Sequence, residues 1–135
     1  MNRKELSKLT SQFLKENKYK ETNPNGYKIN RKALTSSKHW LSLKYEFWDF
    51  YPDACLKCRS VENRQIDHIK PVTMYPWLVL DINNLQPLCK KCNREKLNYN
   101  CNDYRDTEDL LDIKELYKDK PYLHGIRRQW RKYLL

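Results

Sequence analysis

The sequence predicts an α+β fold in which a small metal-binding core lies between helical segments at both ends of the chain. A chain of 135 residues is long enough for one domain with a modest hydrophobic core. Apolar residues recur at helical spacing in residues 1–50 and again in residues 101–135, whereas residues 51–100 carry two Cys-x-x-Cys pairs. We therefore expect a helical N-terminal extension, a central core and a helical C-terminal extension within one compact domain.

Two amphipathic helices are predicted in the N-terminal extension. The first stripe of apolar side chains at helical spacing consists of Leu6, Leu9, Phe13 and Leu14. The second consists of Trp40, Leu43 and Phe47, and it follows Ser36 and Ser37, whose hydroxyls suit the cap of a helix. Residues 22–26 contain the Asn-Pro-Asn-Gly sequence of a turn and separate the two helices.

The C-terminal extension is predicted to hold two further helices of different charge. Thr107 suits the cap of a helix that runs through Leu110, Leu111 and Leu116, and Pro121 suits the start of a last helix that runs to Leu135. Residues 103–119 include seven acidic and three basic side chains, whereas residues 120–135 include five basic and no acidic ones. The basic tail is a candidate for phosphate contact through Arg127, Arg128 and Arg131, and a solvated polar face is the alternative.

The overall charge points to a polyanionic partner. Lys and Arg outnumber Asp and Glu by 27 to 17, which gives a formal net charge of +10. No apolar stretch approaches the roughly 20 residues needed to span a bilayer, and residues 1–5 are too polar for a signal peptide. We therefore expect a cytoplasmic protein without a membrane partner.

The most specific pattern is Cys55-x-x-Cys58 paired with Cys89-x-x-Cys92. Two residues between cysteines allow both thiolates of a pair to bind one ion, and two such pairs complete a tetrahedral Zn²⁺ site. Four thiolates leave no open position for water, so this zinc is expected to be structural. Cys101 is the fifth cysteine, and we interpret it as a bystander.

The segment between and after these pairs resembles the HNH endonuclease superfamily. The resemblance rests on Gln65-Ile66-Asp67-His68-Ile69-Lys70-Pro71, on Asn83-Asn84-Leu85-Gln86-Pro87-Leu88, and on the run from Cys89 to Lys96. It covers about residues 55–97 and implies a ββα-metal core. Trp40, ahead of the first cysteine pair, is also similar to what many phage and restriction HNH proteins contain.

The resemblance assigns a role to each matching position. His68 matches the general base that takes a proton from water, and Asp67 matches the acid that binds a catalytic metal. Asn84 matches the asparagine that holds the histidine-bearing strand in register, with Asn83 as its neighbouring competitor. Asn93 stands where many relatives have a histidine ligand, so the chain is a His-Asn-Asn variant. Two oxygen ligands favour Mg²⁺ or Mn²⁺ over Zn²⁺ or Ni²⁺, and a helix cap is the alternative role for Asn93.

Two basic side chains follow on the helix that is expected to start near Leu88. Arg94 and Lys96 lie on its first turns, where they suit contact with a phosphate.

The resemblance therefore implies a metal-dependent endonuclease that hydrolyses double-stranded DNA to 5′-phosphate and 3′-hydroxyl products. Two other functions stay open: a non-catalytic zinc-ribbon module that binds DNA, and a nuclease with the same core that acts on RNA. A second copy of the chain, or an accessory phage or restriction protein, is the possible protein partner, and a bacterial or phage-infected cell is the expected setting.

Overall fold

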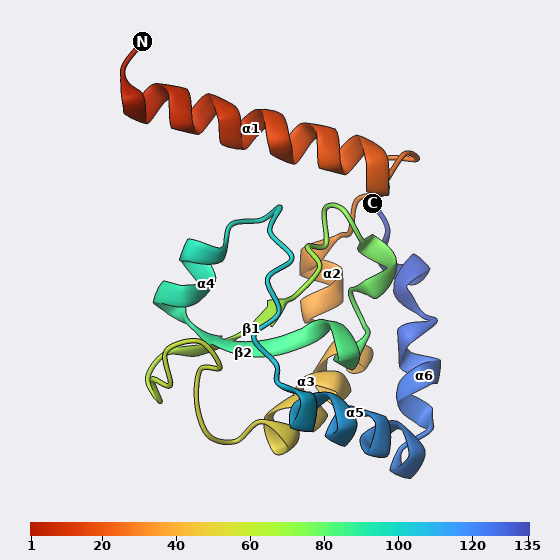
Figure 1. Ribbon diagram of the computed structural model, residues 1–135. Helices are drawn as coiled ribbons and strands as arrows, with labels where there is room; N and C mark the ends of the chain where they lie inside the picture. Colours follow the sequence, from red (N-terminus) through yellow and green to blue (C-terminus); the bar gives the residue numbers. More distant parts are fainter.

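The computed structural model describes residues 1–135 and contains helices around one small antiparallel sheet, which confirms the predicted α+β class (Figure 1). The six α-helices are α1 (Arg3–Thr22), α2 (Arg31–Thr35), α3 (Lys38–Phe50), α4 (Lys90–Lys96), α5 (Thr107–Asp119) and α6 (Tyr122–Arg127). The two strands are β1 (Arg64–His68) and β2 (Leu85–Cys89), and short 3-10 turns lie at Pro76–Leu78, Ile82–Asn84 and Trp130–Tyr133. None of the helices combines the length and the apolar character that crossing a membrane requires.

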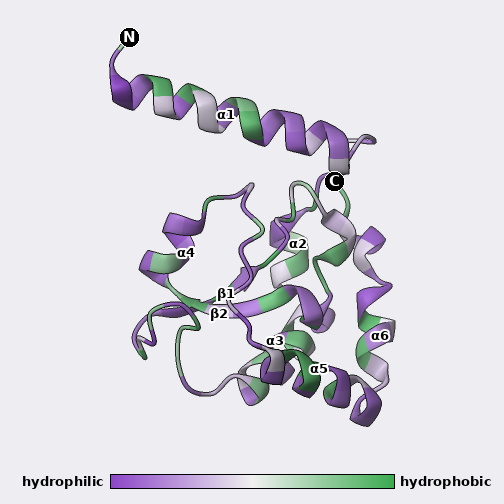
Figure 2. Cartoon of the chain, viewed as in Figure 1, coloured by the Kyte–Doolittle hydropathy of each residue, from purple (hydrophilic) through white to green (hydrophobic).

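Helix α1 is the predicted first helix, but its apolar stripe stays exposed. It extends along one side of the molecule, apart from the other helices (Figure 1), and green apolar turns are visible on it in Figure 2. Leu6 and Phe13 are 58% and 64% exposed, and α1 buries no residue. The half-buried side chains of α1 include Ser11 and Tyr19, and the Ser11 hydroxyl accepts a hydrogen bond from Tyr99. The polar side of α1 therefore contacts the rest of the chain.

Helix α3 carries the second predicted stripe and supplies the centre of the hydrophobic core. Ser37 caps it by accepting a hydrogen bond from the Trp40 backbone N–H at 3.1 Å, as predicted for this serine pair. Leu43 and Phe47 are fully buried. The other buried members of this core are Leu34, Tyr51, Val72, Val79, Leu80, Ile82, Leu85, Leu123 and Ile126. Residues from all three predicted regions thus share one core; the division at residues 50 and 100 itself stays a prediction.

The central segment forms a ββα unit. Strands β1 and β2 pair antiparallel, with Arg64 opposite Cys89 at one end and His68 opposite Leu85 at the other. Helix α4 begins at Lys90, close to the predicted start near Leu88. Leu88 is still paired in β2, and the Cys89 sulfur caps the helix by accepting from the Cys92 backbone N–H. All five residues of β2 are buried.

The C-terminal extension differs from the prediction at the cap of its first helix and at the end of its last helix. Asp106, rather than Thr107, caps α5, because it forms a reciprocal capping box with Asp109. Pro121 does precede α6, but the helix ends at Arg127 instead of running to Leu135. The chain then turns back, and Leu134 forms an isolated antiparallel bridge with Ile29. This bridge requires extended backbone, which a continuous helix does not provide.

Candidate active site and metal centre

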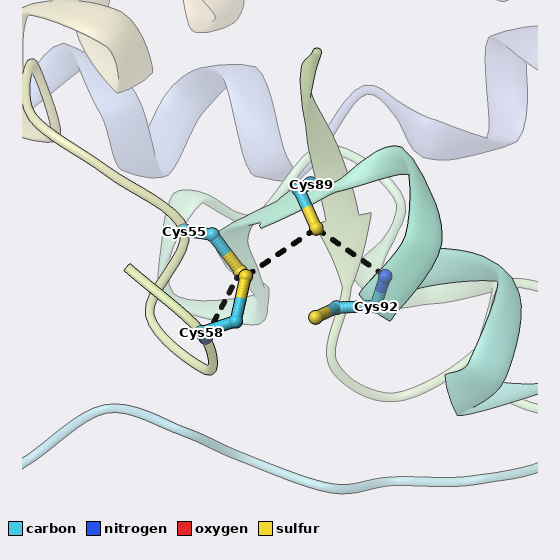
Figure 3. A group of neighbouring side chains, drawn as sticks. All are labelled: Cys55, Cys58, Cys89 and Cys92. Carbon is cyan, nitrogen blue, oxygen red and sulfur yellow. Dashed lines mark hydrogen bonds between the residues drawn. The ribbon is translucent and has the colours of Figure 1, made fainter. Parts of the chain in front are cut away.

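Four cysteine sulfurs converge on one point beside the start of α4 (Figure 3). The sulfurs of Cys55, Cys58, Cys89 and Cys92 all lie within 4.8 Å of one another, and those of Cys58 and Cys89 are 3.6 Å apart. Sulfurs bound at about 2.3 Å to one tetrahedral Zn²⁺ stand about 3.8 Å apart. The donor set and its spacing therefore fit a structural zinc, and Cys101 lies outside the cluster.

Backbone N–H groups prepare these sulfurs for metal binding. Burial raises the pKa of Cys55, but hydrogen bonds, first from the backbone of Cys58, outweigh burial and lower the pKa to about 6. The backbone N–H of Cys92 likewise lowers the pKa of Cys89. Burial raises the pKa of Cys92, and a bound cation deprotonates such a thiol. In each cysteine pair, therefore, one thiol has a lowered pKa, which favours the thiolate that binds a metal.

His68 lies at the end of β1, where three elements fix its ring. Its Nε2 is 3.0 Å from the Val79 carbonyl oxygen, and the Trp40 ring from α3 stacks on it with a centroid separation of 5.8 Å. A carbonyl oxygen only accepts hydrogen bonds, so Nε2 carries the proton and Nδ1 keeps its lone pair. The pKa of His68 is lowered to about 4, mainly by burial and also by the charges of Arg31 and Lys96, against the raising effect of the Val79 carbonyl. The imidazole is therefore neutral at pH 7.

Asp67 is buried beside His68, and one of its two carboxylate oxygens is already engaged. Its Oδ2 accepts a hydrogen bond from Gln86 Nε2 at 3.0 Å and lies 3.4 Å from Lys96 Nζ. Its Oδ1 accepts no hydrogen bond from the chain. Burial raises the pKa of Asp67, against the effects of Gln86 and Lys96. One oxygen of this buried carboxylate is thus free to bind a cation.

Lys96 lies on α4, as the sequence predicts, and its side chain is buried. Its side chain is 2% exposed, and Nζ donates to the carbonyl oxygens of His68, Ile69 and Asn100 at 3.1, 2.9 and 2.7 Å. An ammonium has three hydrogens, and all three are used by these carbonyls. Lys96 thus supports the backbone that carries His68, and its contact with a phosphate stays a prediction.

Asn84 connects the two sides of the loop between the strands. Its Oδ1 accepts from the Lys70 backbone N–H at 2.9 Å, and its Nδ2 donates to the Lys70 carbonyl at 3.0 Å. Its own carbonyl accepts from the Ile69 N–H at 2.8 Å. The neighbouring Asn83 is exposed and bonds Arg105 instead. The backbone that follows His68 is therefore held by Asn84.

Asn93 lies on α4 and faces the same pocket as Asp67 and His68. Its Nδ2 donates to Gln65 Oε1 at 2.9 Å, which leaves its Oδ1 without a partner. The pocket has a volume of about 330 Å³ and opens to solvent. Asp67, His68, Asn93, Arg94, Lys96 and, from outside the central segment, Arg31 are among its lining residues. The structure thus brings the predicted base and both predicted metal ligands to one pocket.

The predicted basic tail lies away from this pocket. Arg127 pairs with Asp81 at 3.6 Å, and the Arg131 guanidinium lies 5.0 Å from the centre of the Trp130 ring. Arg128 is exposed. None of the three lines the pocket. Their contact with phosphates stays a prediction, and it would take place outside this pocket.

Several residues that shape the site have no clear signal in the sequence. Arg31 lies well before the two cysteine pairs, so it belongs to no recognisable motif. The Val79 carbonyl is a backbone group, so no side-chain pattern indicates its role. Gln86, which holds Asp67, does stand in the Asn-Leu-Gln segment that carries the resemblance.

Comparison with known proteins agrees with the motif positions. Residues 55–99 match the family model described as HNH endonuclease. Searches of curated proteins and of solved structures gave no match. The matched segment begins at Cys55 and contains the ββα unit and all four clustered cysteines. The match supports a nuclease-type function, and the four cysteines of the matched segment are positioned to form a metal site.

Proposed function

We propose that this protein is a metal-dependent endonuclease that hydrolyses phosphodiester bonds of double-stranded DNA. The observation that carries the proposal is the shared pocket of Asp67, His68 and Asn93 on an HNH-matching ββα unit. The net charge of +10 supports a polyanionic substrate.

His68 is the proposed general base. Its Nε2–H bond to Val79 leaves Nδ1 as the nitrogen that accepts a proton from the attacking water. Trp40 stacks on the ring and limits its rotation, so the lone pair keeps one direction. The low pKa keeps the ring neutral, at the cost of a weaker base. Water that has lost its proton to His68 attacks phosphorus, the bond between phosphorus and the 3′ oxygen breaks, and this oxygen takes a proton from solvent, which gives 5′-phosphate and 3′-hydroxyl ends.

Asp67 and Asn93 are the proposed protein ligands of one catalytic divalent cation. Each has an oxygen that accepts no hydrogen bond from the chain, and both residues line the pocket. Two oxygen ligands suit Mg²⁺ or Mn²⁺. When bound, such a cation stabilises the negative charge that develops on the phosphate and on the leaving oxygen. Gln86 and Gln65 orient the two ligands by holding their other polar atoms.

The four-cysteine site is proposed to hold zinc in a structural role. Its sulfurs fill all four tetrahedral positions, so no water can reach an ion there. The catalytic cation and the zinc are therefore separate in this proposal.

The decisive experiment compares plasmid cleavage by the parent protein and by His68→Ala. Weakly held metal is removed first, and supercoiled DNA is then incubated with and without Mg²⁺ or Mn²⁺. We expect cation-dependent cleavage by the parent and a rate lower by about 10²–10⁴-fold for His68→Ala, the usual contribution of positioned proton transfer. His124→Ala is the matched control, because His124 contacts Tyr117 and does not line the pocket.

Two outcomes would redirect the proposal. If His68→Ala cuts as fast as the parent, the cleavage comes from elsewhere and the zinc-ribbon binding module becomes the better description. Structured RNA is tested in parallel, and faster cleavage of RNA than of plasmid would reassign the substrate.

A further inference from the structure

Arg31 brings a free cation into the candidate active site from outside the HNH segment. It is the first residue of α2, and it lines the pocket together with Asp67, His68 and Asn93. None of the ion pairs of the chain uses its guanidinium, and the residue is exposed. Its donors are therefore available to a substrate that enters the pocket.

Both extensions of the chain hold Arg31 in this place. The side chain of Asn30 caps α2 by accepting from the Ala33 N–H, and the Asn30 backbone N–H donates to the Tyr133 carbonyl at 2.6 Å. Leu34 of the same helix is buried in the main core. The position of Arg31 therefore follows from how residues 29–34 pack against α3 and the C-terminal tail.

The pocket has two other cations, and they differ from Arg31 in their contacts or in their place. All three hydrogens of the Lys96 ammonium are bonded to carbonyls. Arg94 is exposed like Arg31, but it lies on α4 next to Asn93. Arg31 reaches the pocket from α2, a separate element of the fold. A phosphate between Asn93 and His68 would thus have a cation on the α2 side.

We propose that the Arg31 guanidinium binds the non-bridging oxygens of the phosphate that is cleaved. The inference rests on the proposed nuclease function. A guanidinium presents a planar pair of N–H donors that matches two phosphate oxygens, which an ammonium does not. Charge on these oxygens grows as water attacks phosphorus, so Arg31 stabilises the transition state more than the bound substrate. It transfers no proton.

The test compares Arg31→Ala and Arg31→Lys with Lys32→Ala. Lys32 is the matched control, because it is an exposed cation on the same short helix that does not line the pocket. Single-turnover cleavage of a DNA duplex at saturating protein is measured in Mg²⁺, and affinity for the same duplex is measured without metal. Zinc content and melting temperature are checked for each variant.

We expect Arg31→Ala to lower the single-turnover rate by about 10²–10³-fold, which is the usual loss when one hydrogen-bond donor to the charge of the transition state is removed. Its affinity should fall by no more than about tenfold, because most phosphate contacts remain. Arg31→Lys should recover part of the rate, and Lys32→Ala should keep the rate of the parent.

Two results overturn the inference while the proposed function stands. In the first, the parent cleaves DNA and Arg31→Ala cleaves it at the same single-turnover rate at saturating protein. The other is an equal loss of rate in Arg31→Ala and Lys32→Ala, which would indicate only general surface charge. If the parent itself does not cleave DNA, the nuclease proposal fails, and this inference fails with it.

Discussion

Replacing Lys96 by methionine tests whether this residue supports the fold or contacts DNA. The Lys96 ammonium donates to three carbonyl oxygens and lies 3.4 Å from Asp67 Oδ2. Methionine keeps most of the apolar stem and removes the charge and all three donors. The three carbonyls and the Asp67 carboxylate would then lose a partner whose side chain is almost fully buried.

The expected loss of stability follows from these contacts. Removing one partner of a buried charged pair costs about 3–5 kcal/mol, and each buried acceptor left without a donor costs about 1–3 kcal/mol. The carbonyls keep other contacts, so these costs overlap, and we expect a total of about 3–5 kcal/mol. For a domain of this size that corresponds to a melting temperature lower by on the order of 10 °C or more.

The measurement is urea unfolding with zinc present, supported by a thermal melt and by metal analysis. Lys91→Met is the control, because Lys91 is an exposed lysine of the same helix and its loss should change stability by less than about 0.5 kcal/mol. If both variants unfold at the same urea concentration as the parent, the contacts of Lys96 do not stabilise the fold. A weaker salt dependence of DNA binding in Lys96→Met alone, at parent stability, would restore the phosphate contact.

Two further predictions concern the zinc site and a buried carboxylate. Cys89→Ser, or chelation of zinc, should abolish cooperative unfolding, because such sites supply folding energy directly; parent-like melting, or metal analysis without zinc, would refute the structural role. Burial raises the pKa of Glu46, but hydrogen bonds from Lys120 and Tyr122 outweigh it and lower the pKa below its ordinary value of 4.5. Glu46 therefore stabilises the fold above pH 4.5 and loses this contribution as pH falls through the lowered value. Glu46→Gln should be less stable than the parent at pH 7 by about 1–3 kcal/mol, and the difference between the two urea curves should shrink in acid; a difference independent of pH would contradict this assignment.

The sequence predicts the central segment well because its signals are local. The spacing within and between the cysteine pairs predicts the metal cluster, and the resemblance to the HNH endonuclease superfamily implies the ββα unit. Both signals lie within the central segment and do not depend on the flanks. The helical spacing of Leu43 and Phe47 also predicts α3 correctly. Both side chains are buried on the same face of this helix.

What the sequence does not predict depends on contacts between distant segments. Lys96 follows the cysteine pairs at a position that suggests phosphate contact, and only the fold brings the carbonyls of His68 and Ile69 to its ammonium. Arg31 is one of 27 basic residues, and nothing in its neighbourhood distinguishes it. The stripe on α1 predicts the helix correctly, but periodicity alone does not say whether another element covers it.

The cysteine cluster and the candidate active site lie at opposite ends of the same strand pair, and this arrangement links metal binding to the geometry of the pocket. Arg64 pairs with Cys89 at the zinc end, and His68 pairs with Leu85 at the pocket end. Alternate residues of β1 point to opposite faces, so a register shift of one residue would turn Asp67 away from α4. Cys89 ends β2 and Cys92 lies in the first turn of α4, so an ion bound to both fixes the angle between the strand and the helix that carries Asn93. A zinc held by these cysteines would thus position the residues proposed to cleave a phosphodiester, although it would not itself contact the phosphate.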